Sequence, residues 1–166
     1  MSDSVFLFSF DVAEADAAAE GKRLADWLVR TGWATPLMDP GPRALDTGAL
    51  FNGRGGKLTV HGEPRLNMQG VDMEGPTCPY CGTQKDIDWW LEEYDDDDPY
   101  PVLQCEGCGK DVAYRDWVGT AHPIASNLTL ELEDWDIQSD SPSEPPLLAE
   151  IREEMGGHWV FMWAHT

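Results

Sequence analysis

The chain has 166 residues, 42% of them hydrophobic, and its 31 acidic and 11 basic residues give a formal net charge of -20 at pH 7. This length and composition predict one ordinary domain, or one domain with a small insertion, and exclude wholesale disorder. The charge disfavours nucleic acid and anionic lipid and favours a basic protein partner, although acidity also serves solubility or growth at high salt.

The acidity is concentrated in the second half of the chain, where residues 86–166 carry 20 acidic and 3 basic side chains. The N-terminal segment, residues 1–10, lacks the basic and apolar regions of a signal peptide. No run reaches the roughly 18 apolar residues of a membrane span. With all four cysteines in C-x-x-C pairs, we expect a cytoplasmic protein in a reducing environment, without structural disulfides.

The first half of the chain predicts a strand, a helix, a loop and a second strand. Residues 5–10 form a short apolar run typical of a buried strand. Residues 11–32 place apolar side chains at helical spacing and end in a glycine that suits a helix stop. Residues 33–56 are rich in proline and glycine and predict a loop. Residues 57–61 alternate in polarity, which indicates a half-buried strand.

The second half, beyond the cysteines, predicts a strand, a helix and a strand. Residues 127–133 alternate cleanly between leucine and polar side chains, as a half-buried strand does. Residues 147–155 carry an apolar stripe at helical spacing, preceded by two prolines suited to a first helical turn. Residues 159–163 are all apolar and indicate a strand buried on both faces.

Apart from the cysteine segment, the predicted order is strand, helix, strand, strand, helix, strand. This order resembles the ferredoxin-like βαββαβ sandwich, an α+β fold. We assign residues 1–73 and 119–166 to that core domain and residues 74–118 to an inserted zinc ribbon. The last predicted strand, residues 159–163, fits this resemblance poorly. Its apolar sequence indicates burial on both faces, whereas the ferredoxin-like order would place it at an edge of the sheet. Either the inserted module or a second subunit covers it, or the topology is different.

The cysteines form two short turns, Cys-Pro-x-Cys-Gly and Cys-x-x-Cys-Gly-Lys, made by Cys78, Cys81, Cys105 and Cys108. Both turns resemble the knuckles of zinc ribbons, which implies one structural zinc per chain held by four thiolates. Iron is the alternative, since rubredoxin-type sites use the same ligands. We expect positive φ at Gly82 and Gly109, which lets backbone amides point at the sulfurs. Four protein ligands leave no position for substrate, so catalysis at the metal is not expected.

Between the two turns, aromatic side chains alternate with carboxylates. The candidate partner-binding residues are Trp89, Trp90, Glu92, Glu93, Tyr94, Asp95, Asp96, Asp97 and Asp98. One interpretation is a solvated acidic loop whose aromatic rings pack inward. The other is a contact surface for a basic partner, with aromatic anchors in an acidic field. The negative charge argues against direct nucleic acid binding by this segment.

Signals for catalysis are weak. The histidines, which are His61, His122, His158 and His165, stand in no metal-ligand or nucleophile pattern. Asp134 and Asp136 could form a carboxylate pair, but an acidic loop explains them equally well.

These features favour a non-enzymatic protein-binding module. The profile resembles that of small acidic bacterial immunity or antitoxin proteins, which implies that it neutralises a basic toxin or nuclease. A zinc-ribbon adaptor or scaffold in a larger complex is the first alternative. An enzyme with a pocket on the sheet face, using His158, His165 or Asp136, is the second.

Overall fold

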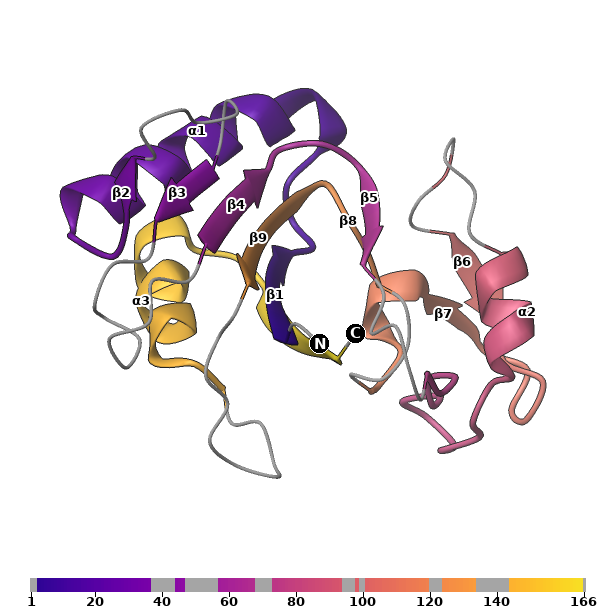
Figure 1. Ribbon diagram of the computed structural model, residues 1–166. Helices are drawn as coiled ribbons and strands as arrows, with labels where there is room; N and C mark the ends of the chain where they lie inside the picture. The colour runs from indigo at the N-terminus through magenta and orange to yellow at the C-terminus, as the bar shows by residue number, and fades with distance from the viewer. Residues whose placement is uncertain are drawn as a thin grey trace.

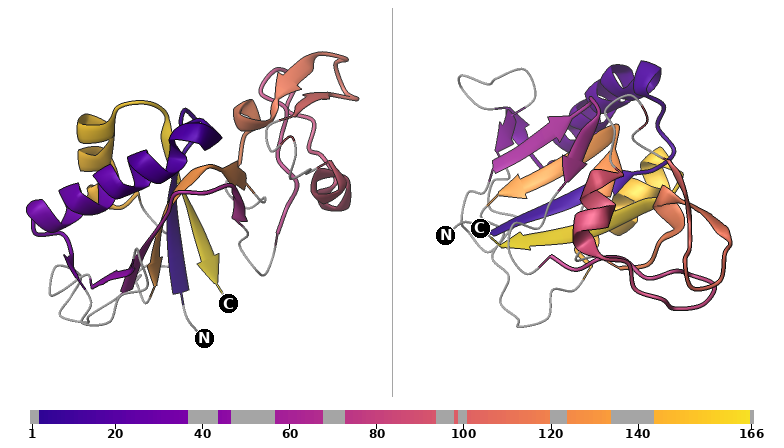
Figure 2. Two further views of the ribbon diagram at one scale, coloured as in Figure 1. Left: turned by 90° about the horizontal axis from the view of Figure 1, so that it is seen from above. Right: turned by 90° about the vertical axis from the view of Figure 1, so that its right-hand side faces the viewer.

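The fold is a mixed α/β structure in which antiparallel sheets and three helices surround separate apolar clusters (Figure 1). The computed structural model describes residues 3–36, 44–46, 57–67, 73–93, 98, 101–119, 124–133 and 144–165. Seen from above, helices α1 and α3 lie on one side of the main sheet and the cysteine-containing segment lies on the other (Figure 2). Among the described helices, none is long and apolar enough to cross a membrane.

The main sheet has six strands in the order β10-β1-β9-β4-β3-β2, and every neighbouring pair is antiparallel. Its strands are β1 (Asp3–Ser9), β2 (Thr35–Pro36), β3 (Ala44–Asp46), β4 (Lys57–His61), β9 (Leu128–Glu133) and β10 (Trp159–His165). The helices over it are α1 (Glu14–Arg30) and α3 (Pro146–Met155). The four strands and two helices expected from the sequence are therefore present. β2 and β3 lie in the segment that was expected to be loop.

The main core lies between the sheet and the two helices. The alternating strands supply its sheet side, with Leu58, Val60, Leu128, Leu130 and Leu132 each at most 1% exposed. Helix α1 closes over them so tightly that a Cβ on Gly21 would lie 3.2 Å from the Cα of Gly62. The alternation of apolar and polar side chains in β4 and β9 thus determines which face of the sheet is buried, as expected.

The opposite face of the sheet is apolar along β1 and β10. Its cluster of buried residues contains Phe6, Phe8, Phe10, Ile124, Met162 and Ala164. In β10, Trp159 packs toward the helices and Met162 toward this second cluster, and they are 1% and 0% exposed. The last strand thus contributes buried side chains to both faces although it lies at the sheet edge, whereas Val160, Phe161 and Trp163 are only partly buried.

A bent two-stranded ribbon links the sheet to the cysteines. β5 (Arg65–Asn67) follows β4 and pairs with β8 (Ile124–Ser126), which precedes β9. Figure 1 shows both strands, β5 and β8, turning away from the main sheet at this point. On β8, Ile124 joins the second-face cluster, whereas Ala125 joins the apolar cluster around the cysteines. One short strand therefore packs against both parts of the molecule.

The cysteine module, which we define as the described residues within 74–118, has its own core. It contains α2 (Ile87–Glu92), β6 (Val102–Gln104), β7 (Asp111–Ala113) and a short 3-10 helix (Tyr114–Asp116). Its buried cluster comprises Cys78, Trp90, Leu103, Cys105, Val112, Tyr114, Trp117 and Ala125. At the base, Thr77 and Val118 exchange two backbone hydrogen bonds of 2.9 Å, so the module closes on itself where the chain enters and leaves.

Candidate metal centre

The two cysteine turns repeat one backbone design. In the first turn, the Cys78 N–H donates to the Thr83 carbonyl and the Gly82 N–H donates to the Cys78 carbonyl, both at 2.9 Å. In the second turn, the Cys105 N–H donates to the Lys110 carbonyl at 2.9 Å and the Gly109 N–H donates to the Cys105 carbonyl at 2.7 Å. Gly82 and Gly109 close these turns with φ of 73° and 71°. The prediction of positive φ is confirmed at both positions. Such a turn presents two sulfurs from four residues, as metal-binding knuckles do.

The four sulfurs meet at one point between the turns. All lie within 4.8 Å of one another, with 3.9 Å between Cys78 and Cys108 and 3.6 Å between Cys81 and Cys105. A tetrahedral zinc with Zn–S bonds of about 2.3 Å would hold its sulfurs about 3.8 Å apart. None of the four cysteines is in a disulfide. The site could therefore hold a metal ion.

A glycine inside the second turn permits this approach. A Cβ on Gly107 would lie 2.1 Å from the Thr83 Oγ1 and 3.1 Å from the Cys81 Sγ. Any side chain there would push the two turns apart. The sequence shows this glycine within the Cys-x-x-Cys spacing, but nothing local reveals that it faces the other turn.

The thiols are electrostatically unequal without a cation. The side chain and backbone of Thr83 hydrogen-bond to Cys81 and lower its pKa to about 6. The backbone at Lys110 favours the Cys108 thiolate, but desolvation and the neighbouring thiols outweigh it and raise its pKa to about 11. One thiolate in the cluster thus disfavours a second. A divalent cation removes that repulsion and displaces the remaining protons, so metal affinity falls as the pH falls.

Trp90, one of the candidate partner-binding residues, is part of the module core. It is 0% exposed and stacks on Tyr114, with ring centroids 4.2 Å apart, and meets Trp117 edge-on at 5.8 Å. The Asp86 carboxylate starts α2 by accepting hydrogen bonds from the N–H groups of Asp88 and Trp89, and the helix turns Trp90 inward. Its inclusion in the contact surface is therefore corrected, because a buried ring cannot touch a partner.

The other predicted contact residues are more accessible. Trp89 is half-buried with the Lys85 ammonium 4.3 Å from its ring centroid. The exposed side chains of Glu92, Glu93 and Asp98 form no ion pair with any described residue. Tyr94, Asp95, Asp96 and Asp97 lie outside the described residues. The structure thus retains an exposed acidic patch at the C-terminal end of α2, defined by Glu92 and its C-cap residue Glu93, with Asp98 as a further exposed carboxylate of the module.

The candidate catalytic residues do not converge where they are described. His158 immediately precedes β10 and its ring contacts Phe10, with centroids 5.4 Å apart, whereas His165 ends the same strand. His122, Asp134 and Asp136 lie outside the described residues. Among these candidates only the side chain of His158 is described, and its described ring contact is with Phe10.

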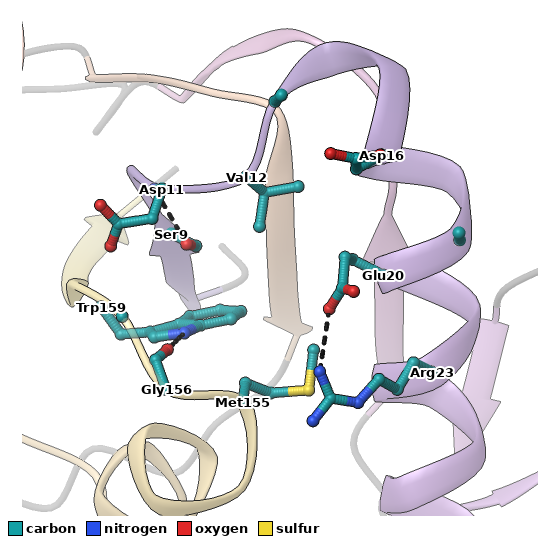
Figure 3. Close-up of a pocket in the computed structure, with 12 residues that line it drawn as sticks. Ser9, Asp11, Val12, Asp16, Glu20, Arg23, Met155, Gly156 and Trp159 are labelled. Carbon is teal, nitrogen blue, oxygen red and sulfur yellow. Dashed lines mark hydrogen bonds and ion pairs between the residues drawn. The ribbon is translucent and has the colours of Figure 1, made fainter.

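A cleft lies between α1 and the end of α3, and Asp11, which lines it, pairs with Arg115 of the cysteine module at 3.4 Å. It has a volume of about 390 Å³, and Val12, Met155 and Trp159 border it together with Asp16 and Glu20 of α1 (Figure 3). Glu20 is paired with Arg23 at 3.2 Å. Among the described residues, its titratable side chains are Asp11, Asp16, Glu20 and Arg23. The described carboxylates there do not form a metal-ligand cluster.

An ion cluster on the second face of the sheet was not found from sequence. The Glu131 carboxylate lies 2.7 Å from the His61 Nε2 and 3.4 Å from the Arg65 Nη1. Its hydrogen bond with His61, helped by the charge of Arg65, lowers the pKa of Glu131 below its ordinary value. Since His61 ends β4 and Arg65 begins β5, the cluster spans the bend of the ribbon. The only sequence signal for this ion cluster is the alternation of side chains along the two strands, which places His61 and Glu131 on the same face of the sheet.

Removing this charge should reveal its contribution as a pH-dependent loss of stability. We expect Glu131→Gln to lower the free energy of unfolding by about 1–3 kcal/mol at pH 7. Because the folded-state pKa is below 4.5, the contribution is present above that pH and disappears as the pH falls through the folded-state value. Urea denaturation of both proteins at pH 7 and at acidic pH measures the difference.

Glu133→Gln is the matched control for that change. Glu133 lies on the same strand as Glu131 and pairs with Lys57 of β4 at 3.6 Å, but both side chains are at least 36% exposed. Its replacement should therefore lower the free energy of unfolding by less than about 1 kcal/mol. A loss at Glu131 that is unchanged at low pH would contradict the electrostatic explanation.

Comparisons with protein-family models, with curated proteins and with solved structures found no match to this chain.

Proposed function

We propose that this chain is a cytoplasmic acidic protein-binding module that neutralises a basic protein, such as a toxin or nuclease, in the manner of an immunity protein. One observation carries the proposal. Exposed carboxylates on α2, unpaired with any described residue, project from a module whose two halves are joined by a four-cysteine site. A fixed acidic surface accelerates and orients the docking of a basic partner.

The proposed fold of the core is ferredoxin-like. The support comes from the order β10-β1-β9-β4, with neighbouring strands antiparallel and α1 and α3 on one face. In a βαββαβ chain this is the arrangement in which the fourth strand flanks the first and the third lies between the first and the second. β3 and β2 would then extend the sheet beyond its usual edge.

Zinc is the proposed metal. The donor set consists of four cysteine sulfurs, which are soft ligands that favour zinc over magnesium or calcium. Zinc would supply a structural cross-link between the two turns, and the four protein ligands would leave no open position for substrate. Elemental analysis of the purified protein should find about one zinc per chain, and iron in its place would correct the metal while leaving the ligand set intact.

The acidic surface acts in this proposal by charge and by shape. Glu92 ends the same short helix as the partly buried Trp89, and Glu93 follows as its C-cap residue, so both carboxylates are three or four positions from the ring. Aromatic anchors beside charged groups are typical of protein interfaces, and cationic side chains pack well against indole rings. The buried Trp90 serves this surface only by fixing α2.

The test is partner capture and inhibition with charge variants. We expect Glu92→Gln/Glu93→Gln/Asp98→Asn to slow association with a captured basic protein by about tenfold or more at low salt, with a smaller effect at high salt. The wild-type protein should inhibit the purified partner at a one-to-one ratio. Association rates over a salt series and a titration of the partner's activity measure these effects.

A control variant carries the same loss of charge on the core. Glu14, Glu63 and Glu153 are exposed and form no ion pair with a described residue, so Glu14→Gln/Glu63→Gln/Glu153→Gln matches the change in net charge. The proposal fails if both triple variants associate equally fast, or if the partner keeps its full activity when bound. Binding without inhibition would instead support the adaptor or scaffold alternative.

A further inference from the structure

A buried lysine in the cysteine module has no described hydrogen-bond partner for its ammonium group. The Lys85 side chain is 4% exposed, and its Nζ hydrogen-bonds to no described group. Burying an ammonium group is costly unless its charge is compensated. Lysine is almost never fully buried unless it is paired. The position therefore calls for a source of negative charge.

The groups that contact the ammonium compensate it only in part. The Trp89 ring centroid lies 4.3 Å away and that of Trp117 5.9 Å away, and both rings offer cation–π attraction. The Glu106 carboxylate lies 3.8 Å away, but its side chain is 84% exposed. Water screens an ion pair with so exposed a partner.

The rings that contact the ammonium belong to the same packed cluster as two of the cysteines. Glu106 directly follows Cys105, and Trp89 and Trp117 pack in the same cluster as Cys78 and Cys105. The backbone is fixed as well, because the Lys85 N–H donates to the Pro76 carbonyl at 2.8 Å. A Cβ on Gly75 would lie 1.7 Å from the Lys85 carbonyl oxygen. These contacts fix the backbone of Lys85 against residues 75 and 76.

We propose that Lys85 is the internal counter-cation of the metal centre. Four thiolates around a divalent ion carry a net charge of about −2, which a nearby buried cation stabilises. The burial of Lys85 and the binding of metal then support each other, and each favours the other by the same factor. This inference rests on the proposed zinc site. It makes Lys85 a positioning residue for metal affinity, distinct from the acidic patch.

The test removes the charge and keeps the apolar stem. We expect Lys85→Met to weaken zinc binding by about 10–100-fold in competition with a chromogenic chelator, as changes around metal ligands do. Lys85→Arg should retain most of the affinity. Lys22→Met is the control, since Lys22 lies on α1, outside the cysteine module, where its side chain is 78% exposed and pairs with Asp26. We expect its affinity to stay within about twofold of the wild-type value because that site is exposed.

A second measurement separates charge from packing. If Lys85 acts as a counter-cation, Lys85→Met should destabilise the zinc-loaded protein to urea but leave the metal-free protein unchanged or more stable. Equal destabilisation of both forms would indicate packing alone and overturn the inference. Zinc affinity of Lys85→Met within about twofold of the wild-type value would overturn it too. A wild-type protein that binds no zinc would instead refute the metal site itself.

Discussion

Replacing Cys105 by serine is expected to unfold the cysteine module while the main sheet stays folded. Cys105 is 0% exposed, and its sulfur lies 3.6 Å from that of Cys81 in the other turn. The proposed zinc would couple metal binding to folding, because structural zinc sites bind with apparent free energies of about 10–16 kcal/mol at pH 7. Losing one ligand should remove most of the coupling. Zinc content and hydrogen exchange, resolved along the chain, measure the two effects.

The regional pattern of exchange provides the control. Amides of β6 and β7 should lose protection, whereas those of β1 and β9 should keep it, because the main core shares no buried residue with the module cluster. Chelation of zinc from the wild-type protein should reproduce the pattern and reverse when zinc is returned. Protected β6 and β7 amides in a metal-free protein would contradict a structural role for the site.

Replacing Trp90 by alanine is expected to be the most destabilising substitution on α2. Its side chain is fully buried between the rings of Tyr114 and Trp117, and truncating such a residue costs about 3–5 kcal/mol. Chemical denaturation of the zinc-loaded protein, followed by a signal from the module, measures the loss.

Trp89→Ala is the matched comparison, since Trp89 is the neighbouring and only partly buried ring. It should cost less stability than Trp90→Ala and should weaken partner binding more at equal folded concentration. If Trp90→Ala were stable and impaired only in partner binding, Trp90 would be a surface anchor and its burial would be wrong.

Short-range patterns predicted the parts of this protein that short-range physics determines. Alternation in residues 57–61 and 127–133 gave both the strands and their buried faces, because side chains in a strand point to opposite sides. The two cysteine turns were predictable down to the positive φ of Gly82 and Gly109, because each turn closes within a few residues. The two helices over the sheet followed from apolar spacing and helix-stop signals.

Features that depend on distant partners escaped prediction. Helix α1 begins at Glu14 rather than at residue 11, and the Asp11 carboxylate accepts a hydrogen bond from the backbone of His158, 147 positions away. Trp89 and Trp90 are adjacent and chemically alike, and only the packing of α2 on Tyr114 distinguishes them. The ion cluster at Glu131 requires strands far apart in sequence to pair first.

The closed base of the cysteine module has a consequence for folding kinetics. His61 and Glu131 meet across 70 positions of chain, and Thr77 and Val118, 41 positions apart, join inside that interval. A module that closes first shortens the loop that pairing of β4 with β9 must close, which reduces its entropic cost by about 1 kcal/mol. The cysteine turns are local and can form before the long-range sheet. Metal supply should therefore raise the refolding rate of the sheet as well as the stability of the module.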